Sequence, residues 1–113
     1  MKLLEKAERI RIYIGEDDKH EGRPLADAIV EKARAAGLAG ATVFRGLSGF
    51  GANSLIHTTK ILRLSEDLPV VIEIVDHPDR LEPFKASLDA MITEGMITSE
   101  PVQVIAYRHA KKR

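Results

Sequence analysis

The segment from Val70 to Val75 constrains the fold most strongly, because all its residues except Glu73 are β-branched and apolar. Such a run predicts a strand in the centre of a sheet. The earlier segment Arg9–Ile14 alternates isoleucine with polar residues, which predicts a strand with one buried face. We expect Glu73 to pair across strands with an arginine such as Arg11. The alternatives are that Glu73 faces a cleft or marks a subunit interface.

Two amphipathic stretches predict helices. The first should begin with Pro24 at its first position and stop at Gly37. The second should open at residues 76–79 and end at Gly95, with Pro83 near its first turn, because a proline deeper in a helix would break it. The apolar positions that recur at helical spacing are Leu25, Ile29, Ala33 and Ala36 in the first stretch, and Leu81, Phe84, Leu88, Met91 and Ile92 in the second.

Two further strands are expected at about Ala41–Leu47 and Val102–Tyr107. The element order is then βαβ twice, which predicts an α+β, ferredoxin-like fold in one domain of residues 1–113. Two helices would cover one face of a four-stranded antiparallel sheet. The other face carries apolar residues such as Val71 and Val75, so we expect another subunit to bury it. Alternatively, the long loop between the middle strands folds back over it.

The charge and cysteine content exclude several classes of function. Seventeen basic residues balance seventeen acidic ones, so the chain has no overall field to bind nucleic acid. The basic end, Arg108–Arg113, is expected to be a solvated terminus. Cysteine is absent, which excludes disulfides and thiolate chemistry. No apolar run could span a bilayer, and the first residues lack the apolar region of a signal peptide, so we expect a cytoplasmic protein.

Three glycines follow the predicted strand at Ala41–Leu47, within the stretch Arg45-Gly46-Leu47-Ser48-Gly49-Phe50-Gly51. Backbone N–H groups in such a turn can bind an anion, and Arg45, Lys60 and Arg63 could contact its phosphates. The alternative is a bulged strand end that acts as a hinge. The turn opens a loop of about residues 48–68, in which we expect Lys60–Leu64 to be extended. Loops of this length are usually functional or disordered.

A second polar loop, Glu16–Glu21, offers carboxylates and His20 as ligands for a hard metal ion. These residues lack a recognisable ligand spacing, so a solvated acidic turn before a helix is the alternative. The remaining histidines and the loop hydroxyls form no nucleophile–base set. We therefore assign no catalytic residue and expect a protein that is not an enzyme.

Several runs together are similar to the signature of the domain of unknown function 190 family (UPF0166-type). They are Gly40–Gly51, Ile56–Thr58 and Leu62–Asp76, with the shorter runs Ile12–Glu16, Pro24–Leu25 and Met96–Thr98. The resemblance spans nearly the whole chain and implies membership of the PII-like superfamily, whose members are ferredoxin-like and typically trimeric.

In PII proteins the loop between the second and third strands is the effector loop. Adenine nucleotides bind between subunits, near the base of that loop and the segment before the last strand. The resemblance places these regions at Gly46–Gly51 and Glu94–Ser99, and so adds Gly95 and Met96 to the candidate ligand-binding residues. The chain carries Glu94-Gly95-Met96 where PII proteins have a basic, glycine-rich segment.

The expected function is that of a PII-like signalling protein. A homotrimer would bind a small anionic effector, with an adenine nucleotide as the expected ligand. The long loop would switch and contact a partner protein, such as a membrane transporter or channel. The alternative is a CutA-like trimer that binds a divalent metal through Glu16, Asp17, Asp18 and His20.

Overall fold

The computed structural model describes residues 5–51 and 67–108. Four strands form one antiparallel sheet in the order β4-β5-β1-β6, and β2 and β3 form a separate hairpin. This arrangement confirms the predicted α+β, ferredoxin-like fold. Along the chain the elements are β1 (Glu5–Gly15), β2 (Lys19–His20), β3 (Arg23–Pro24), α1 (Leu25–Ala35), β4 (Thr42–Arg45), β5 (Pro69–Asp76), α2 (Pro78–Met91) and β6 (Met96–Val104).

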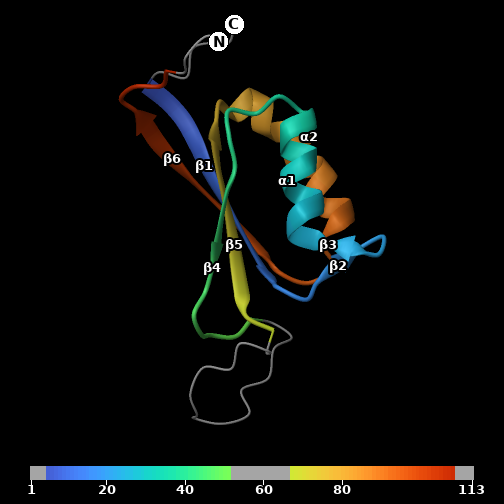
Figure 1. The fold of residues 1–113 in the computed structure, drawn as a ribbon. Helices are drawn as coiled ribbons and strands as arrows, with labels where there is room; N and C mark the ends of the chain where they lie inside the picture. The colour runs from blue at the N-terminus through green and yellow to red at the C-terminus, as the bar shows by residue number, and fades with distance from the viewer. Residues whose placement is uncertain (1–4, 52–66, 109–113) are drawn as a thin grey trace, which may run out of the picture.

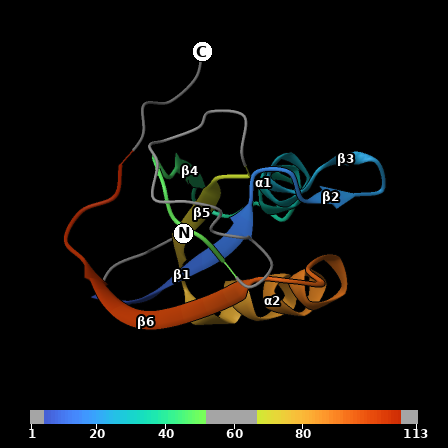
Figure 2. The ribbon, with the colours of Figure 1, turned by 90° about the horizontal axis from the view of Figure 1, so that it is seen from below.

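Both helices lie on the same side of the sheet, as Figures 1 and 2 show from two directions. The core forms between the helices and the two central strands, β1 and β5. Alternate residues of these strands point toward the helices, and burial of each large aliphatic side chain contributes about 1.5–3 kcal/mol. The core cluster comprises Ile10, Ile12, Ile14, Leu25, Ile29, Ala33, Val70, Ile72, Ile74, Leu81, Phe84 and Leu88.

The predicted pair on the sheet is confirmed. Arg11 and Glu73 are register partners on β1 and β5, and the Arg11 Nε lies 2.9 Å from a Glu73 carboxylate oxygen. This hydrogen bond raises the pKa of Arg11. Arg11 also lies 3.7 Å from Glu100 on β6, which in turn pairs with Arg9. The four charges therefore compensate one another on the face turned away from the helices.

The predicted last strand was wrong in its position. β6 begins at Met96 and ends at Val104, whereas Val102–Tyr107 was expected. Alternation failed here because β6 is an edge strand, and its first six residues are exposed on both faces. Their pairing with residues 8–13 of β1, with Met96 opposite Tyr13, holds them in the sheet.

The helix boundaries also differ from prediction. Pro24 is the N-cap residue of α1 and pairs with Lys19, because Glu21 and Gly22 both adopt positive φ and close a hairpin. Pro83 is the sixth residue of α2 rather than part of its first turn. Its ring lies on the exposed side, where water can solvate the carbonyl that loses its donor. The C-cap of α2 is Ile92, and Gly95 instead forms the turn before β6.

The expected extended conformation of Lys60–Leu64 lies outside the described residues. Within the described residues, neither helix has the length and apolar character needed to cross a membrane.

Candidate functional site

A pocket of about 430 Å³ lies at the end of the sheet where β1 ends and β5 and β6 begin. Antiparallel pairing brings these ends together, with Gly15 opposite Pro69 and Tyr13 opposite Met96. This is the lower end of the sheet in Figure 1 and the near end in Figure 2. The described lining residues are Tyr13, Ile14, Gly15, Asp18, Phe50, Gly51, Asp67, Pro69, Glu94, Gly95 and Met96.

Three carboxylates line the pocket, and no described lining residue is basic. The backbone fixes two of them. The Gly15 N–H donates to Asp18 Oδ2 at 2.9 Å, and the Asp17 N–H donates to Asp67 Oδ1 at 2.8 Å. The third, Glu94, lies on the exposed turn before β6. Ionised carboxylates only accept hydrogen bonds, so these groups suit a ligand that donates them.

Two glycines allow the close approaches that shape the pocket. A Cβ at Gly95 would lie 2.6 Å from the carbonyl oxygen of Tyr13, and the φ of +147° at Gly95 also favours glycine. A Cβ at Gly15 would lie 2.7 Å from Asp67 Oδ2. Sequence reasoning selected Gly95 but missed Gly15. The signal for Gly15 was its place directly after the alternating strand.

The structure brings four of the predicted ligand-binding residues to this pocket: Phe50, Gly51, Gly95 and Met96. Gly46 and Gly49 instead pack closely against Pro69. The Gly46 N–H donates to the Pro69 carbonyl at 2.7 Å, so this N–H is not available to an anion. Cβ atoms at Gly46 and Gly49 would lie 2.9 and 3.2 Å from the Pro69 ring.

Gly49 adopts a positive φ of +139°, whereas Gly51 does not adopt positive φ. A Cβ at Gly51 would meet nothing within 4 Å among the described residues. The backbone conformation at Gly51 therefore does not require glycine, but the missing side chain leaves room for a ligand to approach.

Of the three predicted basic residues, the structure describes Arg45. Arg45 forms a forked ion pair with Glu16, with Nε 2.8 Å from one carboxylate oxygen and Nη2 3.1 Å from the other. Its charge is therefore largely compensated at the edge of the site. Ser48 is exposed beside it. Lys60 and Arg63 lie outside the described residues.

The candidate metal ligands Glu16, Asp17, Asp18 and His20 do not converge. Glu16 pairs with Arg45, the Asp18 carboxylate accepts the Gly15 N–H, and His20 lies 3.8 Å from Glu21. Over residues 5–51 and 67–108, no group of three or more His, Asp or Glu side chains could hold a metal ion.

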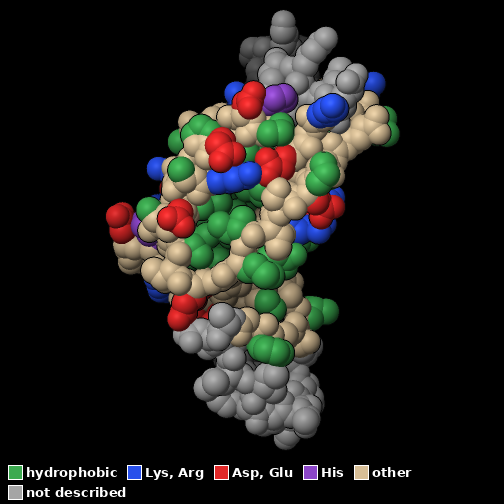
Figure 3. Space-filling view, turned by 180° about the vertical axis from the view of Figure 1, so that it is seen from behind, with side chains coloured by type: hydrophobic (Ala, Val, Ile, Leu, Met, Phe, Trp, Pro, Cys, Tyr) green, Lys and Arg blue, Asp and Glu red, His purple; other side chains and the backbone are tan. Residues whose placement is uncertain are grey.

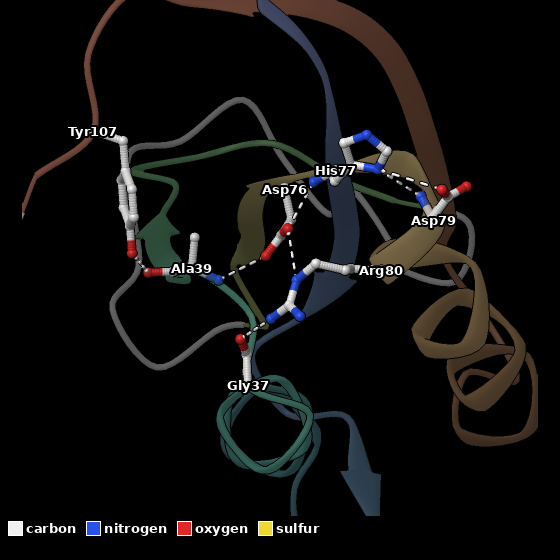
Figure 4. A network of polar contacts seen from close by, with 7 residues as sticks. All are labelled: Gly37, Ala39, Asp76, His77, Asp79, Arg80 and Tyr107. Carbon is white, nitrogen blue, oxygen red and sulfur yellow. Dashed lines mark hydrogen bonds and ion pairs between the residues drawn. The ribbon is translucent and has the colours of Figure 1, made fainter. Parts of the chain in front are cut away.

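A buried carboxylate, Asp76, organises the opposite end of the sheet (Figure 4). It is fully buried and accepts hydrogen bonds from the Ala39 N–H at 2.8 Å, the His77 N–H at 2.6 Å and Arg80 Nε at 3.0 Å. Arg80 also donates to the Gly37 carbonyl. This network joins the end of α1 to the start of α2, and has a structural role.

Glu8 on β1 is the register partner of Asp76 on β5, and it is also buried. Lys85 Nζ lies 2.6 Å and Ser99 Oγ 2.5 Å from its Oε2. Burial raises the pKa of Glu8, but the hydrogen bonds from Lys85 and Ser99 and the charge of Lys85 outweigh this effect, and the pKa lies below its ordinary value.

Comparison with known proteins places the chain among uncharacterised relatives. The model of the family DUF190, described as "Uncharacterized ACR", matches residues 7–104. A UPF0166 protein from Aquifex aeolicus is 38% identical over 100 residues, covering 88% of this chain and 94% of that protein. A UPF0166 protein from Methanocaldococcus jannaschii is 41% identical over 71 residues, covering 63% and 65%.

Among solved structures, the fold is similar to that of CPII from Thiomonas intermedia K12, a structure described as bound to ADP and bicarbonate. The TM-score is 0.56 at 19% identity, and 88% of each chain is covered. This similarity confirms the PII-like fold that the sequence predicted. Because the family model matches most of the chain, the protein belongs to the DUF190 family.

Proposed function

We propose that this protein is a PII-like regulator, not an enzyme, which binds an adenine nucleotide between the subunits of a homotrimer. The observation that carries the proposal is the pocket formed where the turn after β4, the start of β5 and the turn before β6 meet. CPII, which shares the fold, has been solved with ADP and bicarbonate. Pockets with an apolar wall and a few convergent polar groups are typical ligand sites.

The sheet face turned away from the helices supports the proposed assembly. Phe44, Val71, Tyr13 and Met96 lie opposite one another across its four strands, and Phe44 and Met96 are about half exposed. The neighbouring charges, Arg9 and Arg11 with Glu73 and Glu100, are paired within the face. A face with compensated charges can be buried at lower cost than one with unpaired charges.

Exposed hydrophobic side chains also lie at both edges of the sheet. Val43, Phe44, Leu47 and Phe50 lie on or after β4, and Met96 and Ile97 lie on β6. Seen from behind, hydrophobic side chains gather in the middle of the surface, with charged side chains above them and on both sides (Figure 3). Two different apolar edges suit head-to-tail contacts, which form a ring when the rotation between subunits closes.

The segment between β4 and β5 is proposed to carry the response. In this proposal backbone groups of Ser48–Gly51 contact the phosphates, with help from Arg45, Lys60 or Arg63. Arg45 would exchange its present partner, Glu16, for a phosphate. Ligand binding then changes how the segment contacts a partner protein, such as a membrane transporter or channel. The ligand must bind the two states of the segment with different affinity for such a switch to work.

A thermal-shift titration tests the proposal. ATP, ADP, AMP, adenosine and divalent metals are each added to the purified protein, and only a ligand of the folded state raises the melting temperature. We expect a saturable rise with at least one adenine nucleotide. A rise with a divalent metal alone, lost in the Asp17→Asn and His20→Ala double variant, would replace this proposal with a CutA-like one.

A further inference from the structure

The described lining of the pocket combines carboxylates with apolar side chains. Asp18, Asp67 and Glu94 supply the carboxylates, while Ile14, Phe50 and Met96 are among the apolar residues. Asp18 and Asp67 are oriented by backbone N–H groups, but each carboxylate retains lone pairs that can accept further hydrogen bonds. The described lining therefore offers oriented acceptors beside an apolar surface.

These lining residues are not suited to binding a phosphate. A di- or triphosphate is a strong acceptor with several negative charges, and like charges brought close together repel. Arg45, the predicted basic phosphate contact that lies within the described residues, is already paired with Glu16. Phosphate sites in proteins are instead built from guanidinium, ammonium and backbone N–H donors.

The lining suits the nucleoside part of the same ligand. Ribose hydroxyls and the exocyclic amine of adenine donate hydrogen bonds, which carboxylates accept. The flat base can pack against aromatic and apolar side chains such as Phe50 and Met96, and Tyr13 also lies in the lining.

We infer that this pocket receives the uncharged nucleoside end of the ligand, with the phosphates directed out of it and away from Glu94. The inference rests on the proposed function, because it assumes that an adenine nucleotide binds here. Glu94 makes no ion pair or hydrogen bond with any other described residue, so neutralising it should disturb the fold little. Asp18 and Asp67 accept backbone hydrogen bonds and are less suitable for such a test.

Isothermal titration calorimetry tests the inference with adenosine and ADP as probes. The wild-type protein is compared with Glu94→Gln and with Asp89→Asn, a control that removes an exposed carboxylate from α2 outside the pocket. Circular dichroism and sedimentation first establish that all three proteins have the same fold and assembly. The salt concentration is kept constant, because charge effects depend on it.

We expect Glu94→Gln to change the affinities for adenosine and ADP by the same factor, within about twofold, because the phosphates lie away from Glu94. Asp89→Asn should leave both affinities unchanged within the same margin. The inference is overturned if Glu94→Gln strengthens ADP relative to adenosine by about tenfold, or if ADP binds the wild-type protein and adenosine does not. If neither probe nor ATP binds the wild-type protein, the proposed function itself fails.

Discussion

Asp76 is a residue whose role could not be read from its sequence position alone. Sequence reasoning placed it at the opening of the second helix, where it does lie, directly before the N-cap His77. The fold buries its side chain and gives it three donors, of which the Ala39 N–H comes from a distant part of the chain and Arg80 from α2. A buried carboxylate with several donors stabilises the fold only while all its partners remain in place.

Asp76→Ala should destabilise the protein by about 3 kcal/mol, because it leaves the part-buried Ala39 N–H and the Arg80 guanidinium without their acceptor. Urea unfolding at pH 7 measures the change. The matched control is Asp79→Ala. The exposed Asp79 carboxylate lies 3.7 Å from His77, and its removal should change the free energy of unfolding by less than about 0.5 kcal/mol. Equal effects of the two changes would contradict the role given to Asp76.

Glu8 predicts a dependence of stability on pH. Its pKa is lowered in the folded protein, so its charged form contributes stability above the ordinary pKa of about 4.5. That contribution should disappear as the pH falls through the lower, folded value. Glu8→Gln should therefore destabilise by about 1.5 kcal/mol at pH 7, through loss of the contacts to Lys85 and Ser99.

The difference between wild type and Glu8→Gln should shrink as urea unfolding is repeated at pH values falling below 4.5. Glu82→Gln is the matched control, because Glu82 is an exposed carboxylate that lies 3.8 Å from the same Lys85. Glu82→Gln should lower the free energy of unfolding by less than about 0.5 kcal/mol at pH 7. If the difference in unfolding free energy between wild type and Glu8→Gln stays constant with pH, the effect of the substitution is not due to the charge of Glu8.

At the scale of elements, the sequence determined the core strands well. Val70–Val75 and Arg9–Ile14 carry periodicities that the structure confirms, as does the pairing of Arg11 with Glu73. The edge strand β6 was misplaced, because an exposed edge strand needs no alternation and is held by pairing with β1. The hairpin β2–β3 was missed, because Glu21 at positive φ has no sequence signal of its own.

Part of the candidate site was likewise predictable. Phe50, Gly51, Gly95 and Met96 came from a turn pattern and a family resemblance, and they do line one pocket. The acidic lining was not foreseen, because Asp18 and Asp67 are far apart in the chain and meet only through the register of β1 and β5.

The turn before β6 predicts a contrast between two glycines of the pocket. Gly95→Ala should destabilise the protein by about 1–3 kcal/mol, because φ is +147° and the new Cβ would lie 2.6 Å from the Tyr13 carbonyl oxygen. Gly51→Ala should change stability by less than about 0.5 kcal/mol, since nothing described lies within 4 Å. Chemical denaturation measures both, and an equal loss would show that the conformation at Gly95 is not required.

At the scale of the whole molecule, the proposed assembly would use the sheet face that the helices leave uncovered. Val71→Lys places an ammonium in the apolar row beside Phe44 and Tyr13, close to Glu73 on the same face. A single subunit can accommodate this charge, whereas a buried interface cannot without cost. Analytical ultracentrifugation should therefore find trimers for the wild type and smaller species for Val71→Lys.

Ala90→Lys on the exposed surface of α2 is the control for that experiment and should sediment like the wild type. Circular dichroism should show that Val71→Lys retains the fold. Trimers that persist unchanged in Val71→Lys would mean that the open sheet face is not the interface, and that the apolar strand edges must be tested instead.

Native mass spectrometry of the purified protein with adenine nucleotides tests the central proposal most directly, because it reports subunit number and bound ligand together. The proposed function predicts the mass of three chains with up to three molecules of ADP or a related nucleotide. Subsaturating ligand should give intermediate species with one and two bound. The mass of a single chain, or of any assembly that carries no nucleotide at millimolar ligand, would contradict it.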